Sequence, residues 1–504
     1  MNPKLRHRLR AIYHCSNRAI LLLGFLSTCQ ILSAQAPERP NVLLIVCDDL
    51  NSHLTPSGYK PIETPSLDKL ATESMTFHRA YCQYPVCGPS RASMLSGLYP
   101  ESTGVLDNKT DIRESLPNRV SLPQTFKRNG YWTASTGKVF HSPRHQPGAA
   151  AWDQQIRFQN EELPIVTAAR EQFEKEHGSV ELRGNRRKWK ALVATLSTQT
   201  RGQTPPGFGP SGLRDDQHKD GKNARQVVQW IQNQTFGTKP FFIACGIQKP
   251  HVPFLAPQKY FDQYPTHLLP KDETPDDDWQ DIPPMALVKR FTAFGFEAQT
   301  RNEPLRRNYI QAYHACISFI DAQIGLVLDT LRSSPYWQNT IILFTSDHGY
   351  HLGEHFLWGK VSLFEESART PLMVRAPGFT IPGSSSSSLV EQVDFFPTLL
   401  DLCNIRPEQS LQGTSFKELL RTPSKQGKER AYTGVSRGKH LGRSIRTARW
   451  RYALWDSPDN EELYDLASDP GEFQNLAGKS SHATVLEQMR SHLASARKQA
   501  MSER

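Results

Sequence analysis

Three short apolar runs, each followed within a few residues by charged side chains, restrict most strongly what this chain can fold into. Residues 40–46, 240–246 and 340–345 are rich in aliphatic and aromatic side chains, which is typical of strands buried on both faces of a parallel sheet. Helical patterns cover 220–231 and 306–331, and parallel strands need such crossover connections. The pattern predicts an α/β fold with a mostly parallel sheet between helices.

The polar residues that follow these strands are expected to meet at one edge of the sheet. A further strand is expected at 131–134, and open α/β sheets bind ligands at the carboxyl ends of their strands. Each polar group taken alone is as consistent with an ordinary surface loop, and only their joint occurrence predicts a site. The residues concerned are Asp48 and Asp49, Lys138 and His141, Lys249 and His251, and Asp347 and His348.

The stretch Val86–Gly97 combines a cysteine, a proline and an arginine at the expected start of a helix. Proline is tolerated in the first helical turn, so we expect Cys87 at a helix N-terminus, where unpaired N–H groups favour an anion. Arg91, four residues on, lies on the same face and can direct two donors at that anion. For a cysteine considered alone, a buried structural position is the alternative interpretation.

The order Cys87-x-Pro89-Ser90-Arg91, followed by a Leu-Ser-Gly helix end, resembles the signature of the type I sulfatases. The resemblance extends over nearly the whole chain after the N-terminal segment, because further motifs occur in the order of that family. These motifs are Asp48-Asp49, Gly137-Lys138-x-x-His141, Lys249-Pro250-His251, Ser346-Asp347-His348-Gly349, Lys360, and the tail motif Glu462–Leu466 with Asp469-Pro470. The Asp347-His348 pair, the Lys-Pro-His spacing and Ser444–Thr447 are similar to the iduronate-2-sulfatase branch.

The resemblance implies an alkaline-phosphatase-like fold: a mixed, mostly parallel sheet sandwiched by helices, with a smaller C-terminal α+β subdomain of antiparallel sheet plus helix. It also implies a secreted hydrolase that removes O-sulfate from a sulfated polysaccharide or glycosaminoglycan, with 2-O-sulfate on a uronic acid favoured. In this family the cysteine, here Cys87, is converted to formylglycine (3-oxoalanine) by a formylglycine-generating maturation enzyme. The implied Ca²⁺ ligands are Asp48, Asp49, Cys87, Asp347 and His348, and oxygen-rich ligation suits this hard cation.

The catalytic roles are likewise those that the resemblance implies. The hydrated aldehyde at Cys87 attacks sulfur, and Asp347 or the metal helps to remove its proton. Arg91, Lys138 and Lys360 neutralise charge on the sulfuryl oxygens. His251, with Lys360, protonates the departing sugar oxygen, and His141 then takes the proton of the second hydroxyl so that sulfate leaves.

Substrate binding is expected to involve basic residues outside this set. We predict that Lys249 contacts the substrate, and that a basic loop in the tail reaches the rim of the site and meets a uronate carboxylate. That loop contains Arg437, Lys439 and His440, with Arg443 beyond it. The alternative interpretation of the loop is an ordinary solvated basic turn.

The predicted organisation begins with a signal peptide over residues 1–36, formed by a basic region, an apolar run and Ala34-Gln35-Ala36. It implies export to the periplasm or the medium and no stable membrane span after cleavage; a lipid or membrane anchor is the alternative. We then expect a catalytic domain over 37–405, a linker over 406–430 and the C-terminal subdomain over 431–504. Within the catalytic domain, 146–215 is expected to be a surface excursion near the substrate pocket and Ser384–Ser388 a flexible loop.

Composition and cysteine spacing exclude some other classes. The net charge is +10, but no long basic run alternates with aromatic residues, which argues against a nucleic acid partner. The cysteines show no zinc-binding spacing. Two other functions remain open at this point: a phosphate or phosphonate monoester hydrolase of the same superfamily, and a non-catalytic protein that binds sulfated glycans.

Overall fold

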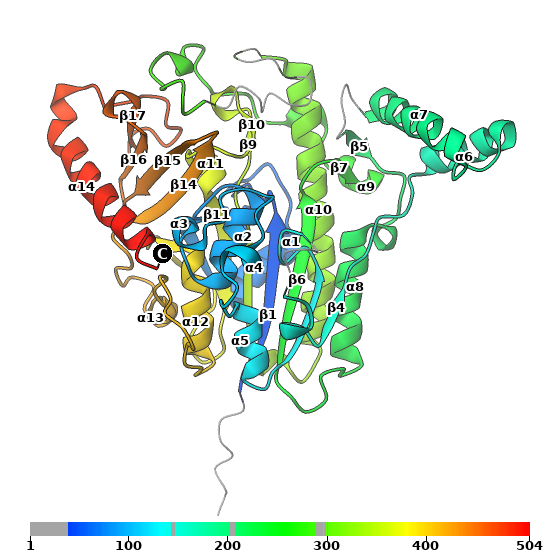
Figure 1. Ribbon diagram of the computed structural model, residues 1–504, viewed down its shortest axis with the longest axis horizontal. Helices are drawn as coiled ribbons and strands as arrows, with labels where there is room; N and C mark the ends of the chain where they lie inside the picture. The colour runs from blue at the N-terminus through cyan, green and yellow to red at the C-terminus, as the bar shows by residue number, and fades with distance from the viewer. Residues whose placement is uncertain are drawn as a thin grey trace, which may run out of the picture. The chain divides into compact units, whose positions relative to one another are not determined.

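The apolar runs form the centre of a large mixed sheet, as Figure 1 shows in a computed structural model of the chain. The structure describes residues 39–142, 147–201, 207–287, 296, 299 and 301–503, and those from Arg39 on belong to one compact unit. The predicted signal peptide, residues 1–36, lies outside the described residues.

Among the described residues this sheet has nine strands, in the order β12-β2-β11-β8-β1-β6-β3-β4, with β13 also paired to β2. The central pairs β8-β1-β6-β3 are parallel, and β11 runs antiparallel to both of its neighbours. The predicted mostly parallel sheet is therefore confirmed. The strands are β1 Asn41–Asp48, β2 Met75–Tyr81, β3 Trp132–Gly137, β4 Gln154–Ile156, β6 Phe241–Pro250, β8 Thr340–Ser346, β11 Arg369–Arg375, β12 Ser384–Ser386 and β13 Val390–Glu391.

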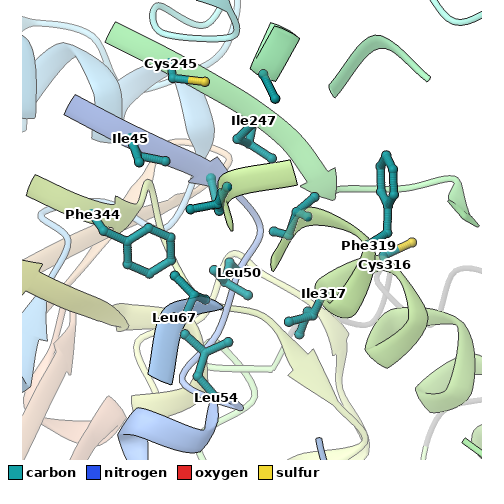
Figure 2. Close-up of a cluster of buried hydrophobic side chains, with 14 of the residues drawn as sticks. Ile45, Leu50, Leu54, Leu67, Cys245, Ile247, Cys316, Ile317, Phe319 and Phe344 are labelled. Atoms are coloured by element: carbon teal, nitrogen blue, oxygen red, sulfur yellow. The ribbon is translucent and has the colours of Figure 1, made fainter. Parts of the chain in front are cut away.

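Strand β1 is buried on both faces because its alternate side chains enter two different cores. Leu43 and Ile45 pack into one core with helices α1, α8 and α10, and Figure 2 shows part of this core between the sheet and α10. Val42 and Leu44 pack into the other core with helices α2, α5 and α12. The six helices are α1 Pro65–Glu73, α2 Cys87–Ser96, α5 Leu122–Arg128, α8 Lys219–Gln232, α10 Glu303–Arg332 and α12 Phe395–Leu402.

Helix α10 is the one described helix whose length and composition would allow it to cross a membrane. In its most apolar window, 78% of the residues are buried inside the protein. A helix that is apolar nearly all round is expected at the core of a large domain, and α10 accordingly packs on α8, α1 and β7.

Two glycines allow β3 and β6 to approach closely at the functional edge. A Cβ on Gly137, which has φ +70°, would lie 1.9 Å from the carbonyl oxygen of Gly246, and a Cβ on Gly246 would lie 2.2 Å from the carbonyl carbon of Lys138. Only glycine fits such a contact. The pair therefore fixes the backbone that carries Lys138.

The C-terminal part forms a four-stranded antiparallel sheet with helix α14 packed on it, as predicted. This sheet lies beside the large sheet in Figure 1. Its elements are β14 Ala431–Arg437, β15 His440–Arg446, β16 Trp450–Trp455, β17 Glu461–Asp465 and α14 Ala483–Ala500.

Three segments differ from expectation or add to it. Ser384–Ser386, predicted as a flexible loop, forms strand β12 at the edge of the sheet, because its backbone pairs in parallel with β2. The expected surface excursion contains helices α6 and α7, and the expected linker contains α13. The remaining elements are α3 Pro100–Thr103, α4 Ile112–Ser115, α6 Pro164–His177, α7 Arg183–Arg201, β5 Phe208–Pro210, β7 Phe254–Ala256, α9 Gln258–Phe261, β9 His351–Leu352, β10 Trp358–Gly359, α11 Glu365–Ala368 and α13 Lys417–Arg421, besides short 3₁₀ turns.

A buried glutamate links the two sheets. Glu365 accepts hydrogen bonds from Arg446 Nε at 2.8 Å, from Arg451 and from the Tyr81 hydroxyl at 3.1 Å. Burial raises the pKa of Glu365, but Arg446, Arg451 and Arg369 outweigh it and hold the pKa below its ordinary value. The ionised carboxylate therefore stabilises the folded protein.

Two leucines on α10 give a matched test of the core. Leu328 is fully buried, whereas Leu326 is 38% exposed. We expect Leu328→Ala to lower the free energy of unfolding by about 2–5 kcal/mol, because it leaves a cavity, and Leu326→Ala to change it by less than about 1 kcal/mol. Urea denaturation followed by circular dichroism measures both, and equal losses would contradict this packing.

The Glu365 contacts predict a pH-dependent loss of stability. Because the folded pKa is depressed, the stabilisation is present above the ordinary carboxyl pKa, about 4.5, and is lost as the pH falls further. Glu365→Gln should cost about 3–5 kcal/mol at pH 7, and its difference from wild type should shrink below about pH 4. Urea midpoints across this pH range measure the effect, with exposed Glu171→Gln as control; a difference independent of pH would refute it.

Candidate functional site

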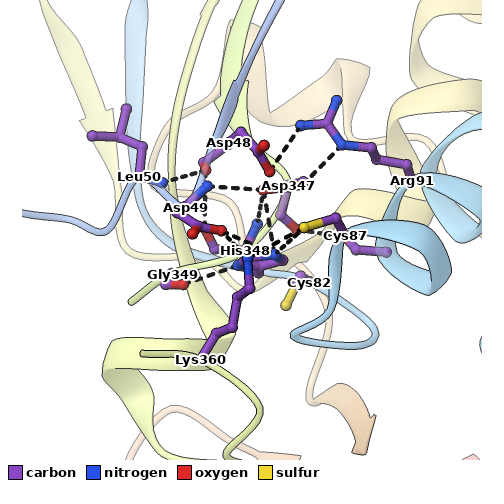
Figure 3. Close-up of polar contacts among 12 residues, drawn as sticks. Asp48, Asp49, Leu50, Cys82, Cys87, Arg91, Asp347, His348, Gly349 and Lys360 are labelled. Atoms are coloured by element: carbon purple, nitrogen blue, oxygen red, sulfur yellow. Dashed lines mark hydrogen bonds and ion pairs between the residues drawn. The ribbon is translucent and has the colours of Figure 1, made fainter. Parts of the chain in front are cut away.

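Three carboxylates meet where β1 and β8 end, as Figure 3 shows. Asp48 is the last residue of β1, and Asp347 directly follows β8. Asp347 Oδ1 accepts from the backbone N–H of Asp49 at 3.2 Å and from that of His348 at 3.0 Å. All three carboxylates are fully buried. The prediction that these strand ends converge is confirmed, because β1 and β8 are parallel and in register from Asn41 to Cys47.

Asp49 has a left-handed backbone, with φ +67°, which is uncommon outside glycine and asparagine. The Tyr313 hydroxyl donates to the Asp49 carbonyl at 2.6 Å and accepts from the Asn51 N–H at 3.0 Å. Ser346 Oγ accepts from the Leu50 N–H at 2.9 Å. These contacts hold the turn that points the second carboxylate into the site.

Cys87 is the first residue of helix α2, as predicted. Its side chain is 1% exposed, and its Sγ lies 3.3 Å from both His348 Nε2 and Lys360 Nζ. Burial and Asp48 raise the pKa of the thiol, but Lys138 and Lys360 outweigh them, and the net pKa is lowered. The other described cysteines are also buried thiols without disulfides.

Arg91 reaches the same cluster from the next turn of α2. Its Nε donates to Asp347 Oδ2 at 2.8 Å, and its terminal nitrogens donate to the carbonyl groups of Cys47, Lys138 and Val139. The N–H groups of the guanidinium, which we expected to bind an anion, therefore donate to groups of the protein itself. This arrangement fits a positioning role, in which Arg91 fixes Asp347 and the backbone beside Lys138.

Two lysines add compensating charge from the solvent side. Lys138 Nζ donates to Asp48 Oδ2 at 2.5 Å, and Lys360 Nζ donates to Asp49 Oδ1. Burial lowers the pKa of each lysine, but the neighbouring carboxylates raise it further, and the net pKa of both is raised. The side chains stay 17% and 13% exposed, so both ammonium groups are charged and remain accessible to a ligand.

His348 lies between the thiol and the carboxylates. Its Nδ1–H donates to the Gly349 carbonyl at 3.0 Å, and its Nε2 is 3.6 Å from Asp49 Oδ1 and from Asp347 Oδ1. Burial lowers the pKa of His348, but Asp347 and the Cys87 sulfur more than compensate and raise it to about 9. Binding of a metal ion through Nε2 would require the proton on that nitrogen to be lost, because a metal-bound imidazole is neutral.

The donor set fits a hard divalent cation. Asp48 Oδ1 and Asp49 Oδ2 are buried oxygens without a hydrogen-bond partner among the described residues, which is costly unless a cation binds them. Ligand atoms of Asp48, Cys87, Asp347 and His348 lie within 4.8 Å of one another, as do those of Asp48, Asp49, Cys87 and His251. Carboxylate oxygens are the ligands that Ca²⁺ prefers.

His141 and His251 flank this cluster on the sheet edge. His141 lines a cavity together with Lys138, and burial, Lys138 and Arg91 lower its pKa to about 4. The ring of His141 is therefore neutral near pH 7 and able to accept a proton. His251 Nδ1–H donates to the Val252 carbonyl at 2.7 Å, which fixes the orientation of the ring. The structure brings both histidines to the predicted edge.

Lys249 has a different environment from the one we predicted. It is 5% exposed, and its Nζ donates to the carbonyl groups of His251, at 3.0 Å, and Pro253. Asp220 accepts from the backbone N–H groups of Gln248 and Lys249 at 2.8 and 2.9 Å. These contacts shape the turn that carries His251, and the predicted substrate contact stays a prediction.

The basic tail loop joins β14 to β15, and among the described residues no hydrogen bond or ion pair links its side chains to the carboxylate cluster. Arg437 stacks on Trp455 at 4.9 Å and donates to the Ala286 carbonyl at 3.4 Å. His440 hydrogen-bonds Asp456, and Lys439 is exposed. Their predicted role toward a uronate remains untested by this arrangement.

Several supporting residues were missed from the sequence. The Ser90 hydroxyl donates to the Asp347 carbonyl and lies 2.9 Å from Gln392 Oε1, and Gln392 Nε2 donates to the Ser346 carbonyl at 2.6 Å. Ser90 lies within the cysteine motif and could have been singled out there. Gln392 and Tyr313 carry no such signal, because their sequence surroundings are those of ordinary core residues.

The comparisons with known proteins agree with this geometry. A sequence model of the family described as Sulfatase matches residues 40–405, and one for the C-terminal part of N-sulphoglucosamine sulphohydrolase matches 353–499. The chain is 33% identical to a sulfatase of Formosa agariphila, over 90% of this chain and 86% of that protein. It is 30% identical to mouse iduronate 2-sulfatase, over 93% and 97%.

Among solved structures, a phosphonate monoester hydrolase of Agrobacterium radiobacter matches with a TM-score of 0.74. The match covers 92% of this chain and 96% of that one, at 22% identity. At this identity the likeness shows the shared fold, which confirms the predicted alkaline-phosphatase-like architecture.

Two serines on α2 provide a matched test of the site's support. Both are fully buried, but only Ser90 bonds to the Asp347 peptide, whereas the Ser93 hydroxyl has no hydrogen-bond partner among the described residues. We expect Ser90→Ala to cost about 1–3 kcal/mol of stability and about 10- to 100-fold in kcat, because Asp347 loses its anchor. Ser93→Ala should be close to wild type in both measurements. Equal kcat values for the two variants would refute the anchoring role.

Proposed function

The chain belongs to the sulfatase family and is a sulfuric ester hydrolase, and we propose that its substrate is a sulfated polysaccharide or glycosaminoglycan carrying 2-O-sulfate on a uronic acid. The reaction class is carried by one observation: a buried cysteine at a helix N-terminus touches His348 and Lys360 beside three carboxylates. The choice of substrate is supported by the identity to iduronate 2-sulfatase over nearly the full length of both chains.

We propose that Cys87 acts after oxidation to formylglycine by a maturation enzyme. Hydrated formylglycine supplies a hydroxyl nucleophile for sulfur and a second hydroxyl whose deprotonation releases sulfate, which a thiol does not supply. The position suits an oxygen nucleophile, since the helix N-terminus and Lys360 Nζ, 3.3 Å from Sγ, favour negative charge there.

We propose that Asp48, Asp49, Asp347 and His348 hold Ca²⁺ together with the oxygen at position 87. The buried oxygens of Asp48 and Asp49 without hydrogen bonds support this assignment. The cation would supply positive charge next to the sulfuryl oxygens.

The remaining catalytic and positioning roles are assigned to side chains around position 87. Lys138 and Lys360 are the accessible cations beside position 87 and bind the sulfuryl oxygens, where charge stabilisation contributes most to such reactions. Arg91 holds Asp347 in place. His251 protonates the departing sugar oxygen, and His141, neutral near pH 7 because its pKa is lowered to about 4, accepts the proton that accompanies sulfate release.

Export is the further part of the proposal. It rests on the basic and apolar pattern of residues 1–36, and a large sulfated polysaccharide is a substrate met outside the cytoplasm. Fractionation of the producing cells, with N-terminal sequencing of the mature protein, tests it; a protein that retains residue 1 in the cytoplasm would contradict it.

Sulfate release from position-defined saccharides tests the substrate, after mass spectrometry has confirmed the aldehyde at residue 87. We expect release from 2-O-sulfated uronates. Release only from other positions would agree with sulfatase activity but overturn the 2-O assignment. Cleavage of phosphonate monoesters with no release from any sulfate ester would overturn the sulfated substrate itself.

Cys87→Ser should lower kcat by at least about 10³-fold, because serine cannot become the aldehyde hydrate by the same maturation and cannot expel sulfate from its ester. Cys82→Ser is the matched control, since Cys82 is also a buried thiol and lies nearby in Figure 3. Turnover of purified Cys87→Ser close to that of wild type would refute the proposed nucleophile.

A further inference from the structure

The cavity lined by Lys138 and His141 extends from the catalytic residues toward α8. Its volume is about 260 Å³, and Lys138 and His141 form the wall that it shares with the carboxylate cluster. The cavity is also lined by Arg157, just after β4, and by Lys219, the first residue of α8. A group bound in this cavity would therefore lie directly beside the sulfate site.

The residues lining this cavity are strongly biased toward hydrogen-bond donors. Lys138, Arg157 and Lys219 are cations, Gln159 and Gln248 add amide groups, and none of the described residues that line the cavity carries a carboxylate. Phe158 adds an apolar surface. A wall of cations and amides beside one aromatic ring suits an anionic sugar, which has charged substituents and an apolar ring face.

The two outer cations, Arg157 and Lys219, line the cavity without being neutralised by an acidic side chain of the described residues. Among the described residues, neither Arg157 nor Lys219 has an ion pair through its side chain, whereas Lys222, one turn further along α8, pairs with Glu161 at 3.3 Å. The acid next to Lys219, Asp220, is instead bonded to the N–H groups of Gln248 and Lys249. The positive charge of the cavity is therefore left for a ligand.

The electrostatic environment of Lys219 agrees with this conclusion. Burial lowers the pKa of Lys219, and the nearby Lys249 and Lys138 lower it further against the opposing effect of Asp220 and Asp48. An anion in the cavity would offset this repulsion and raise the pKa of Lys219, which favours the charged ammonium form.

The tail loop is less suited to the same task. His440 is engaged by Asp456, and Arg437 stacks on Trp455 and donates to backbone carbonyl groups. Binding a carboxylate there would require these contacts to be exchanged, whereas the side chains of Arg157 and Lys219 form no hydrogen bond or ion pair with the part of the chain that the structure describes.

We propose that Arg157 and Lys219 form a specificity subsite that binds a second anionic substituent, a carboxylate or a second sulfate, of the sugar whose sulfate is hydrolysed. The inference rests on the proposed function, because it assumes a sulfated sugar with its scissile sulfate at Lys138 and Lys360. In this proposal Arg157 and Lys219, which lie outside the catalytic motifs, determine whether the enzyme prefers singly or doubly charged sugars.

The test compares sulfate release from three 4-nitrophenyl glycosides that all carry a 2-O-sulfate. They are the 2-O-sulfo-β-glucuronide, the 2-O-sulfo-β-glucoside without the carboxylate, and the 2,6-di-O-sulfo-β-glucoside. Wild type should prefer at least one doubly charged ester by about tenfold or more in kcat/KM. In Arg157→Ala/Lys219→Ala this preference should be largely lost, a fall of about tenfold, because both cations that would pair with the second anion are removed. The singly charged ester should change by less than about twofold.

Several variants sharpen the interpretation. Lys222→Ala, on the same helix but paired with Glu161, should retain the wild-type preference. Arg157→Lys should retain part of it, because the charge remains but the planar fork is lost. Lys439→Ala should leave the preference intact; if it abolishes the preference while the double variant does not, the tail loop is the subsite and the proposal is overturned.

The outcomes separate the two proposals. Wild type that prefers the glucuronide identifies a carboxylate subsite, and wild type that prefers the disulfated glucoside identifies a sulfate subsite; either supports the inference when the double variant loses the preference. Sulfate release from all three esters at equal rates, or an unchanged preference in the double variant, would overturn the subsite alone. No sulfate release from any ester by aldehyde-containing wild type would overturn the proposed function.

Discussion

Burial of three carboxylates in one cluster is the constraint on which the rest of this site depends. Asp48, Asp49 and Asp347 are fully removed from water, and like charges in such a place are strongly unfavourable unless they are paired. Arg91, Lys138, Lys360 and His348 supply that pairing, each within hydrogen-bonding or ion-pair distance. Under the proposed function the same balance serves catalysis, because fixed charges would bind a cation and an anionic ester with little reorganisation.

The fold provides this balance by bringing separate segments to one edge. Parallel pairing of β1 with β8 and β6 aligns the ends that carry the carboxylates and His251. The close approach of Gly137 and Gly246 places Lys138 beside them. Helix α2 adds Cys87 and Arg91 from a different layer, and Ser90 fastens that helix to the Asp347 peptide. The charged site is thus rigid because it lies on strand and helix ends and their hydrogen bonds.

The smaller sheet is attached by the same kind of interaction. Glu365 joins Arg446 and Arg451 of that sheet to Tyr81 of the large one, and Glu391 accepts from the Tyr432 N–H at 2.8 Å and the Tyr99 hydroxyl at 2.8 Å. Buried, directional contacts of this kind fix one relative arrangement where apolar packing alone would allow several. The C-terminal part therefore forms part of the support of the catalytic edge.

The sequence by itself determined the strands, the main helices and the identity of the central charged residues. Buried parallel strands are visible as apolar runs, and the charged residues of the site occur in short motifs next to those runs. It did not reveal that Ser384–Ser386 pairs as a strand, since the hydrogen bonds of an edge strand do not depend on apolar side chains. Only the tertiary structure decided that Arg91 binds Asp347 and backbone carbonyls, that Lys249 donates to carbonyl groups of its own loop, and that Arg157 and Lys219 line one cavity with Lys138 and form no ion pair among the described residues. The physical reason is that charge compensation and hydrogen bonding depend on which groups meet in space. Arg91 and Asp347 are 256 positions apart in the chain, and such a separation leaves no periodic pattern that records the contact.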